Sequence, residues 1–323
     1  MDDLDARAEP RAVVRRLPLE PGVYRFRDAG GRVLYLGRAI SLRRRVASYW
    51  GDLRDRRHLA PMVARIARLE AVACDSPHEA AWLERNLLRA RRPPWNRAPD
   101  GGQEVEVWIG LHESARSPGL TISHQPAPGI RNFGPYLGGR QVRLAVSGLN
   151  RVLPLGYAGD LDGTRGDLAR VRGVTAADRA QLAERVAAVL DRVPEPVASA
   201  RAALCARRDA ASGELAFELA GRLQAEVEAL DWVTGPQRVT RPGADDCDAH
   251  GWADGLLVRF EIRDGHLTGW TQRACAGPAA RRYLDRTPAD WTGFAARNAA
   301  LAAQLRCPAV ASQPLSHDRS NRT

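Results

Sequence analysis

The sequence predicts an α+β protein: an N-terminal domain with a small central antiparallel sheet flanked by helices, then a helical hairpin, then a small C-terminal β-containing segment. Three observations predict this class. β-Prone runs alternate around a glycine turn within residues 22–37, and helical apolar periodicity runs through residues 176–192 and 197–232. Alternation returns within residues 250–272, around the turn signal Arg263-Asp264-Gly265. With 323 residues and 44% hydrophobic side chains, the chain can form two or three domains with buried cores.

The chain is strongly basic, with a net charge of +10, and every one of its 48 basic residues is arginine. This charge favours an anionic partner, and nucleic acid is the commonest; a solvated basic surface is the alternative. No apolar run approaches the roughly 20 residues that span a bilayer, and the N-terminus has no apolar signal core. We therefore expect a cytoplasmic protein with no membrane partner.

The first element is a β-hairpin. Two alternating runs, residues 22–26 and 33–37, flank the turn signal Asp28-Ala29-Gly30-Gly31. A two-residue loop at the centre of this turn would place Tyr24 directly opposite Tyr35, on one face of the sheet. The two phenols would then stand side by side, either as part of a site or as a cross-strand pair that merely packs.

A helix follows, with Ser41 as its expected N-cap. Its inward stripe, at i, i+3, i+4 and i+7, holds Leu42, Arg45, Val46 and Tyr49. An inward guanidinium is costly unless it has a partner. Arg45 is therefore expected to form an ion pair or to clamp a phosphate, which its planar fork of donors suits.

A later helix begins at Ser76, with a capping box to Glu79 and a proline at its first position. Its inward stripe is apolar except for Glu84, which needs a cation, either an arginine or a metal. Arg45 and Glu84 could pair with each other, or they could line one cleft that holds a metal and a phosphate. The stripe consists of Ala80, Leu83, Glu84, Leu87 and Leu88.

Five motifs in this region, in register and at fitting spacings, closely resemble the start of the UvrC family, whose front domain is a GIY-YIG nuclease. The first two carry Gly-Val-Tyr and Tyr-Leu-Gly, the third an arginine-rich helix start, the fourth a glutamate and the fifth a terminal asparagine. They are Leu17–Tyr24, Leu34–Ala39, Leu42–Val46, Glu79–Leu88 and Pro94–Asn96.

The resemblance implies a role for each matching residue. Tyr24 and Tyr35 match the pair that positions and activates the attacking water, and the sequence does not decide which is the base. Arg45 matches the arginine that binds the scissile phosphate. Glu84 matches the carboxylate that binds Mg²⁺ or Mn²⁺, and Asn96 matches a residue that braces the site.

Three further arginines belong to this expected site. Arg38 stands where UvrC usually has lysine, so it keeps the charge but not the compact ammonium geometry. The resemblance places it among the catalytic residues. Arg43 and Arg44, beside Arg45, are expected to bind DNA.

The next segments also resemble UvrC. Phe133-Gly134-Pro135-Tyr136 matches the family's connecting segment, expected here as strands and a helix over residues 101–155. Residues 156–195 are expected to form a linker and a helix. The stretch Leu153–Gly173, rich in Gly and Asp, is the expected linker. It has none of the cysteines that bind the family's iron–sulfur centre, so no cluster is predicted.

Residues 196–235 resemble the UVR motif, the helical hairpin by which UvrC contacts UvrB. Phe217 and Glu218 are the expected partner-binding residues. Gln224-Ala225 stands where the family has Arg-Asp. An ordinary amphipathic helix with Phe217 in a core is the alternative.

The expected boundaries are residues 12–100 for the GIY-YIG domain, 240–306 for a small β-containing segment resembling the start of the UvrC C-terminal half, and 307–323 for a disordered tail. No room is left for the family's RNase H-like nuclease or helix-hairpin-helix pair. The chain therefore resembles a short UvrC homologue of the Cho type.

The expected function is a metal-dependent DNA endonuclease that cuts damaged double-stranded DNA on the 3′ side of a lesion in nucleotide excision repair, with UvrB of the UvrA–UvrB system as partner. A catalytically inactive module that binds DNA or UvrB is one alternative. A GIY-YIG enzyme outside repair is another, and the UvrC-like segments after residue 130 argue against it.

Overall fold

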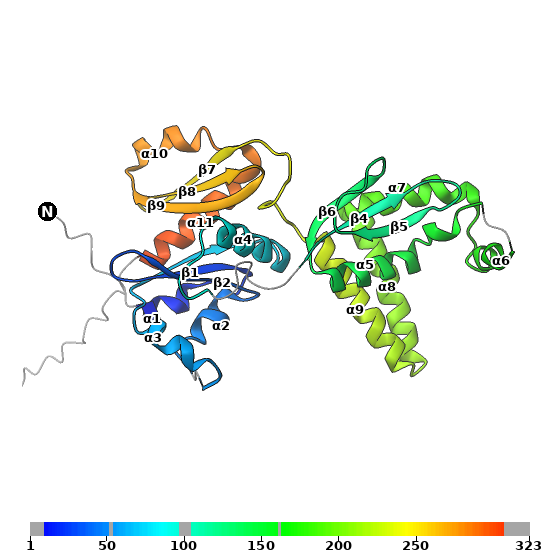
Figure 1. Ribbon diagram of the computed structural model, residues 1–323, viewed down its shortest axis with the longest axis horizontal. Helices are drawn as coiled ribbons and strands as arrows, with labels where there is room; N and C mark the ends of the chain where they lie inside the picture. The colour runs from blue at the N-terminus through cyan, green and yellow to red at the C-terminus, as the bar shows by residue number, and fades with distance from the viewer. Residues whose placement is uncertain (1–9, 52–53, 97–104, 161–162, 307–323) are drawn as a thin grey trace, which may run out of the picture.

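The structure is a computed structural model that describes residues 10–51, 54–96, 105–160 and 163–306. It has two lobes (Figure 1): residues 10–51, 54–96 and 237–306 form one, and residues 105–160 and 163–236 form the other. Each lobe combines helices with antiparallel sheets, three sheets of three strands in the described residues. The predicted α+β class, with a small antiparallel sheet in the N-terminal domain, is confirmed.

The first sheet has the strand order β2-β1-β3, so β1 is central and both neighbours are edges. Its strands are β1 (Gly22–Arg27), β2 (Val33–Ala39) and β3 (Arg68–Ala73). The short helices α1 (Pro10–Val13), η1 (Val14–Arg16), α2 (Leu42–Ala47), η2 (Arg54–Leu59) and α3 (Ala60–Val63) surround one face. Helix α4 (Pro77–Ala90) covers the other face, so two separate cores meet at this sheet.

The predicted two-residue hairpin loop is wrong. The loop between β1 and β2 is longer: Asp28 N donates to Arg32 O (3.0 Å) and Gly31 adopts φ +81°. Tyr24 therefore lies opposite Gly37, and Phe26 opposite Tyr35. Because the register is displaced by two residues rather than one, both phenols still share a face, with ring centroids 6.2 Å apart.

Two helix starts differ from the predictions. Ser41 makes no capping bond at the start of α2. At α4, Ser76 Oγ accepts from Glu79 N (3.0 Å) as predicted, but Glu79 Oε2 accepts from Asp75 N (2.7 Å) instead of closing the capping box on Ser76. The single buried stripe predicted for α4 is also too narrow, since residues 78–88 are all buried. The helix contacts β1 and β2 on one side and β9 on another, which leaves no solvent face there.

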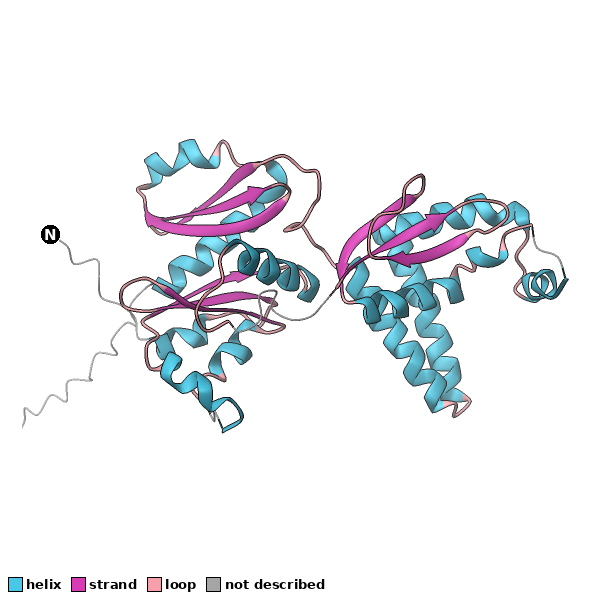
Figure 2. Ribbon diagram, viewed as in Figure 1, coloured by secondary structure: helices cyan, strands magenta, loops and turns pink. Residues whose placement is uncertain are grey.

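The second lobe combines a sheet of order β5-β4-β6 with helices. The predicted linker within residues 153–173 contains two helices, η3 (Leu155–Tyr157) and α6 (Gly163–Val171). Figure 2 shows the predicted hairpin as two long antiparallel helices, which reverse at Glu214–Ala216, where Leu215 has φ +58°. The remaining elements are β4 (Glu106–His112), β5 (Gly119–Ser123), β6 (Arg131–Leu137), α5 (Gly139–Val152), η4 (Ala176–Asp178), α7 (Arg179–Leu190), α8 (Pro194–Gly213) and α9 (Phe217–Thr234).

The C-terminal segment is a β-meander followed by two helices that the sequence did not predict. Its strands are β7 (Cys247–Ala253), β8 (Leu256–Arg263) and β9 (His266–Ala274), and its helices are α10 (Gly277–Leu284) and α11 (Ala289–Arg306). The predicted turn at Asp264-Gly265 is present, with φ +50° and +69°. The predicted disordered tail lies outside the described residues.

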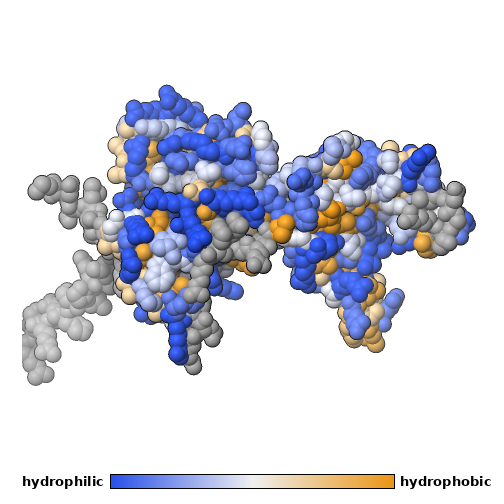
Figure 3. Space-filling model, in the orientation of Figure 1, coloured by the Kyte–Doolittle hydropathy of each residue, from blue (hydrophilic) through white to orange (hydrophobic). Residues whose placement is uncertain are grey.

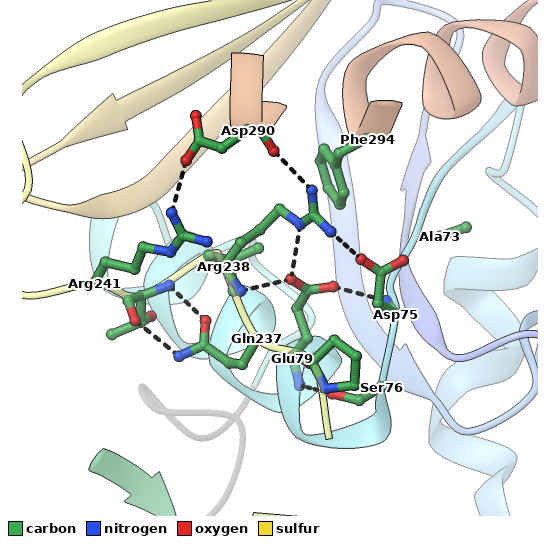
Figure 4. Close-up of polar contacts among 12 residues, drawn as sticks. Ala73, Asp75, Ser76, Glu79, Gln237, Arg238, Arg241, Asp290 and Phe294 are labelled. Atoms are coloured by element: carbon green, nitrogen blue, oxygen red, sulfur yellow. Dashed lines mark hydrogen bonds and ion pairs between the residues drawn. The ribbon is translucent and has the colours of Figure 1, made fainter. Parts of the chain in front are cut away.

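Arg238 connects this segment to the first sheet's helix α4 (Figure 4). Its backbone N–H donates to Glu79 Oε1 (2.8 Å), its Nη1 donates to Asp290 O (2.9 Å), and its Nη2 bonds Asp75. Arg297 of α11 also pairs with Asp75 (2.6 Å). Helix α4 is thereby enclosed between sheets from opposite ends of the sequence. Among the described helices, none is both long and apolar enough to cross a bilayer.

Candidate active site

Three tyrosines meet on the face of the first sheet that carries α2. Tyr24 Oη and Tyr49 Oη are 2.7 Å apart, and the ring centroid of Tyr35 lies 6.1 Å from that of Tyr49. Tyr24 and Tyr49 are fully buried, whereas Tyr35 is partly exposed. The sequence predicts Tyr49 only as a member of the helix's inward stripe. Its place in the candidate site depends on the packing of α2 against β1, which no local pattern in the sequence shows.

Gly37 makes this close approach possible. A Cβ at this position would lie 2.7 Å from Tyr24 Oη and 2.8 Å from Tyr35 Cε1. Both contacts are shorter than van der Waals packing allows. The glycine of Tyr-Leu-Gly is therefore required by the two phenols and not by the backbone conformation of β2.

The phenols are held in their neutral form. Burial raises the pKa of Tyr24 well above its usual value, and the neighbouring phenols of Tyr49 and Tyr35 raise it further. Burial and Tyr49 also raise the pKa of Tyr35, while Arg45 opposes the shift. At neutral pH both tyrosines are therefore hydrogen-bond donors, and the cation of Arg45 is the nearby charge that favours ionisation.

Arg45 is exposed, so the prediction that it lies on a buried inward stripe is wrong. Helix α2 has only six residues, of which Leu42 and Val46 are buried. The guanidinium nevertheless reaches the cluster, with Cζ 5.7 Å from the ring centroid of Tyr49. Partial burial lowers its pKa, but the phenol oxygens of Tyr24, Tyr49 and Tyr35 outweigh this and raise the pKa overall. The cation lies where solvent and a ligand can reach it.

Glu84 projects from α4 to the edge of β2 and is 6% exposed. Its Oε1 accepts from Arg38 N (3.2 Å), and its Oε2 lies 3.3 Å from Arg38 Nε. The carboxylate thus has the cation it needs. The sequence left open a pair between Glu84 and Arg45; the arginine that pairs with Glu84 in the structure is Arg38.

Asn96 binds the same strand. Its Oδ1 accepts from Leu36 N (3.0 Å) and its Nδ2 donates to Leu36 O (2.7 Å). This amide satisfies both backbone groups of a residue on an edge strand, where such groups otherwise lack partners. The asparagine therefore fixes β2 between Tyr35 and Arg38.

The remaining predicted residues lie apart from this cluster or serve the fold. Arg43 Nε donates to Leu17 O (2.6 Å), which gives that arginine a structural contact, while Arg44 is exposed. Phe217 is 65% exposed, so the alternative that it fills a core is wrong. It lies with Glu218 in the second lobe, at the tip of the α8–α9 hairpin, where Figure 3 shows a hydrophobic end.

Strand β2 thus organises the cluster: it carries Tyr35 and Arg38 and binds Glu84 and Asn96. Tyr35 and Arg38 are three residues apart on this strand, a separation of about 10 Å. The Gly-Val-Tyr strand paired with the Tyr-Leu-Gly strand, a following helix with an arginine and a later helix with a glutamate define a GIY-YIG domain.

Comparison with known proteins agrees. Residues 20–97 match the family model described as a UvrC-like GIY-YIG domain. The chain is 31% identical over 274 residues to the UvrABC system protein C of Desulforudis audaxviator, covering 81% of this chain and 44% of that protein. It is 30% identical over 283 residues to the same protein of Mycobacterium tuberculosis, covering 78% and 42%. The chain belongs to the UvrC-like GIY-YIG proteins and spans less than half the length of these relatives.

A solved structure is similar over the first domain. The GIY-YIG N-terminal endonuclease domain of UvrC from Thermotoga maritima, bound to magnesium, is 32% identical. The match covers 94% of that chain and 27% of this one, with a TM-score of 0.24.

Proposed function

We propose that this chain is a metal-dependent DNA endonuclease of nucleotide excision repair, which hydrolyses one phosphodiester bond on the 3′ side of a lesion. The observation that carries the proposal is the buried carboxylate of Glu84 on the same strand edge as a cluster of phenols and an exposed guanidinium. In-line hydrolysis of a phosphodiester needs an activated water, a polarised phosphate and stabilisation of developing charge.

The donor set fits Mg²⁺ or Mn²⁺ at Glu84. Mg²⁺ typically binds one or two carboxylates and completes its shell with water and substrate phosphate oxygens. Within the described part of the chain no group of three His, Cys, Asp or Glu side chains could hold a metal alone, so the other ligands would be water and DNA. Arg38 must release the Glu84 carboxylate for this to happen. When bound, the cation polarises the phosphate and offsets charge on the leaving oxygen.

The three tyrosines differ in exposure, and their proposed roles differ accordingly. Tyr35 is partly exposed and can contact the attacking water, whereas Tyr24 is fully buried and cannot. Tyr24 and Tyr49 hold the cluster together through their phenol–phenol hydrogen bond. Tyr35 is therefore proposed as the residue that orients the attacking water through a hydrogen bond to its phenol oxygen, and Arg45 as the residue that binds a phosphate oxygen. Asn96 positions β2.

Damaged double-stranded DNA is the proposed substrate, UvrB the proposed partner, and the cytoplasm the proposed location. The exposed apolar side chains Leu215, Phe217 and Leu219 at the hairpin tip support a protein contact there. The proposal includes no iron–sulfur cluster, because residues 153–173 carry no cysteine.

Substitution of Glu84 by glutamine tests the assignment. We expect nicking of a lesion-bearing duplex in Mg²⁺ or Mn²⁺ to fall at least ~100-fold, because the isosteric amide cannot bind the cation. The assay is run with and without UvrA and UvrB. Glu184→Gln, which removes an exposed carboxylate on α7, is the matched control and should cleave normally. Undiminished nicking by the Glu84 variant would refute the site.

A non-catalytic module that binds DNA or UvrB is the second candidate. The contact that favours it is the Arg38–Glu84 ion pair, which already satisfies the carboxylate. This candidate requires DNA binding that metal does not change and no nicking by the unaltered protein under any of these conditions.

A further inference from the structure

A cavity of about 480 Å³ lies on the side of the first sheet away from the tyrosine cluster. Arg25 and Arg27 point into it because they alternate along β1 with Tyr24 and Phe26. The hairpin loop, the segment after α4 and strand β9 form its other walls. Five arginines line this arginine cavity: Arg25, Arg27, Arg32, Arg91 and Arg92.

The floor of the arginine cavity is held by ion pairs within the protein. Arg25 Nε lies 2.5 Å from Glu70 Oε2, and Arg27 Nε lies 2.8 Å from Glu70 Oε1. Arg25 Cζ also lies 3.7 Å from the centroid of the Trp270 ring. These two arginines and Glu70 form a fixed group that shapes the cavity.

The mouth of the cavity is different. Arg32, Arg91 and Arg92 are exposed, and across the ranges described above their guanidinium groups have no hydrogen-bond or ion-pair partner. Glu261, the one carboxylate in the lining, pairs with Arg259 (3.3 Å). Three exposed arginines of like charge therefore line one cavity. Such a cluster is suited to an anion with several acceptor oxygens.

The lining selects for phosphodiester groups over bases. Trp270 is 2% exposed, and the side chain of Arg25 covers its ring. The aromatic ring that lines the cavity is therefore not available for stacking a base. Guanidinium forks at separate positions match the repeated phosphates of a nucleic-acid strand.

The cavity is connected to the candidate active site by one short segment. Arg92 precedes Asn96 by four residues, and this segment is fixed to β2 by Trp95 N donating to Leu34 O (3.2 Å) and by the two bonds of Asn96. Four extended residues span at most about 14 Å. A DNA strand rises ~3.4 Å for each nucleotide, so the distance corresponds to about four nucleotides.

We infer that the arginine cavity binds the phosphodiester backbone of the cleaved strand within about four nucleotides of the scissile bond. The inference rests on the proposed DNA substrate but not on catalysis. The cavity thus holds the strand on one side of the sheet while the phenols and Glu84 meet the scissile group at the edge of β2.

Binding is measured by fluorescence anisotropy with a labelled duplex of about 20 base pairs in EDTA, so that no cleavage is needed. We expect Arg91→Ala/Arg92→Ala to weaken binding about 10-fold or more at 0.15 M salt. The negative slope of the logarithm of the binding constant against the logarithm of salt concentration should also become shallower by about 1.8, because two phosphate contacts are lost. Arg207→Ala/Arg222→Ala, which removes two exposed arginines of the α8–α9 hairpin, is the charge-matched control. Equal losses in the two double variants would overturn the inference.

Neutral methylphosphonate linkages locate the contact along the strand. A single neutral linkage within about four nucleotides of the expected cut should weaken binding by the unaltered protein and have little effect on the Arg91/Arg92 variant. If both proteins lose the same affinity at every position, the cavity does not hold the strand. If binding follows this pattern but the protein never nicks DNA, the inference about the arginine cavity is supported and the nuclease proposal is refuted. If the unaltered protein nicks DNA but the two double variants lose the same binding affinity, the nuclease proposal stands and the cavity inference fails.

Discussion

Gly37 shows how one residue determines the shape of the candidate site. It lies opposite Tyr24 in the β1–β2 register and beside the Tyr35 ring. Any side chain there would enter the space in which the two phenols meet. The tyrosine cluster therefore depends on the lack of a Cβ atom at position 37 as well as on the tyrosines themselves.

The change Gly37→Ala should therefore cost about 1–3 kcal/mol of stability through overpacking and displace the Tyr35 ring. Urea unfolding measures the first effect, and nicking of lesion-bearing DNA at saturating substrate measures the second. Gly213→Ala is the control, because a Cβ at that helical position meets open space. A Gly37 variant as stable and as active as the unaltered protein would contradict the packing argument.

At the scale of elements, the two edges of the first sheet are closed in the same way. Asn96 bonds both backbone groups of Leu36 on β2, and Asn298 of α11 bonds Ala73 N (2.7 Å) and Ala73 O (3.1 Å) on β3. Two side-chain amides from outside the sheet thus occupy backbone groups that an edge strand would otherwise offer to another chain. Across the sheet, Glu70 of β3 links the paired arginines of β1.

We expect Glu70→Gln to destabilise the protein by about 3–5 kcal/mol at pH 7, because buried Arg25 would lose its anionic partner. Burial raises the pKa of Glu70, but Arg25 and Arg27 outweigh it, and the net shift is downward. A lowered folded pKa means that the stabilisation is present above the unfolded pKa and is lost as the pH falls through the folded pKa. Urea unfolding from pH 7 to pH 3 should show the two proteins converging in acid; a constant difference would contradict this.

At the scale of the whole molecule, His78 joins the two lobes. It comes from α4 in the first lobe and lies against Tyr136 and Trp232 of the second, with ring centroids 5.6 and 4.2 Å away. Its Nε2 accepts from both Trp82 Nε1 (3.1 Å) and Leu137 N (3.3 Å). Two donors at Nε2 require the neutral ring with its proton on Nδ1.

Acid should therefore weaken the junction. Burial, with a contribution from Arg192, lowers the pKa of His78 to about 3. Between the unfolded pKa near 6.5 and this value only the unfolded state takes up a proton, so stability falls by up to ~1.4 kcal/mol for each pH unit as the pH decreases. His78→Gln should lack this part of the pH dependence. Urea unfolding followed by tryptophan fluorescence from pH 7 to pH 4 tests this; identical slopes for the two proteins would exclude His78 as the source.

The local features of this fold can be predicted from the sequence. The paired β-runs, the Ser76-Pro77 start of α4, the α8–α9 hairpin and the Asp264-Gly265 turn each depend on residues close together in the chain, and short-range periodicity and turn chemistry are sufficient to specify them. The family motif likewise identified the residues that gather at β2.

Which of these side chains meet depends on how distant parts of the chain pack. The Arg38–Glu84 pair, the approach of Tyr49 to Tyr24 and the return of α11 to β3 join residues 46, 25 and 225 positions apart. The hairpin register was also missed, because the turn signal allowed more than one loop length. Such contacts depend on how whole elements pack. A local sequence pattern does not specify which distant element will pack against it.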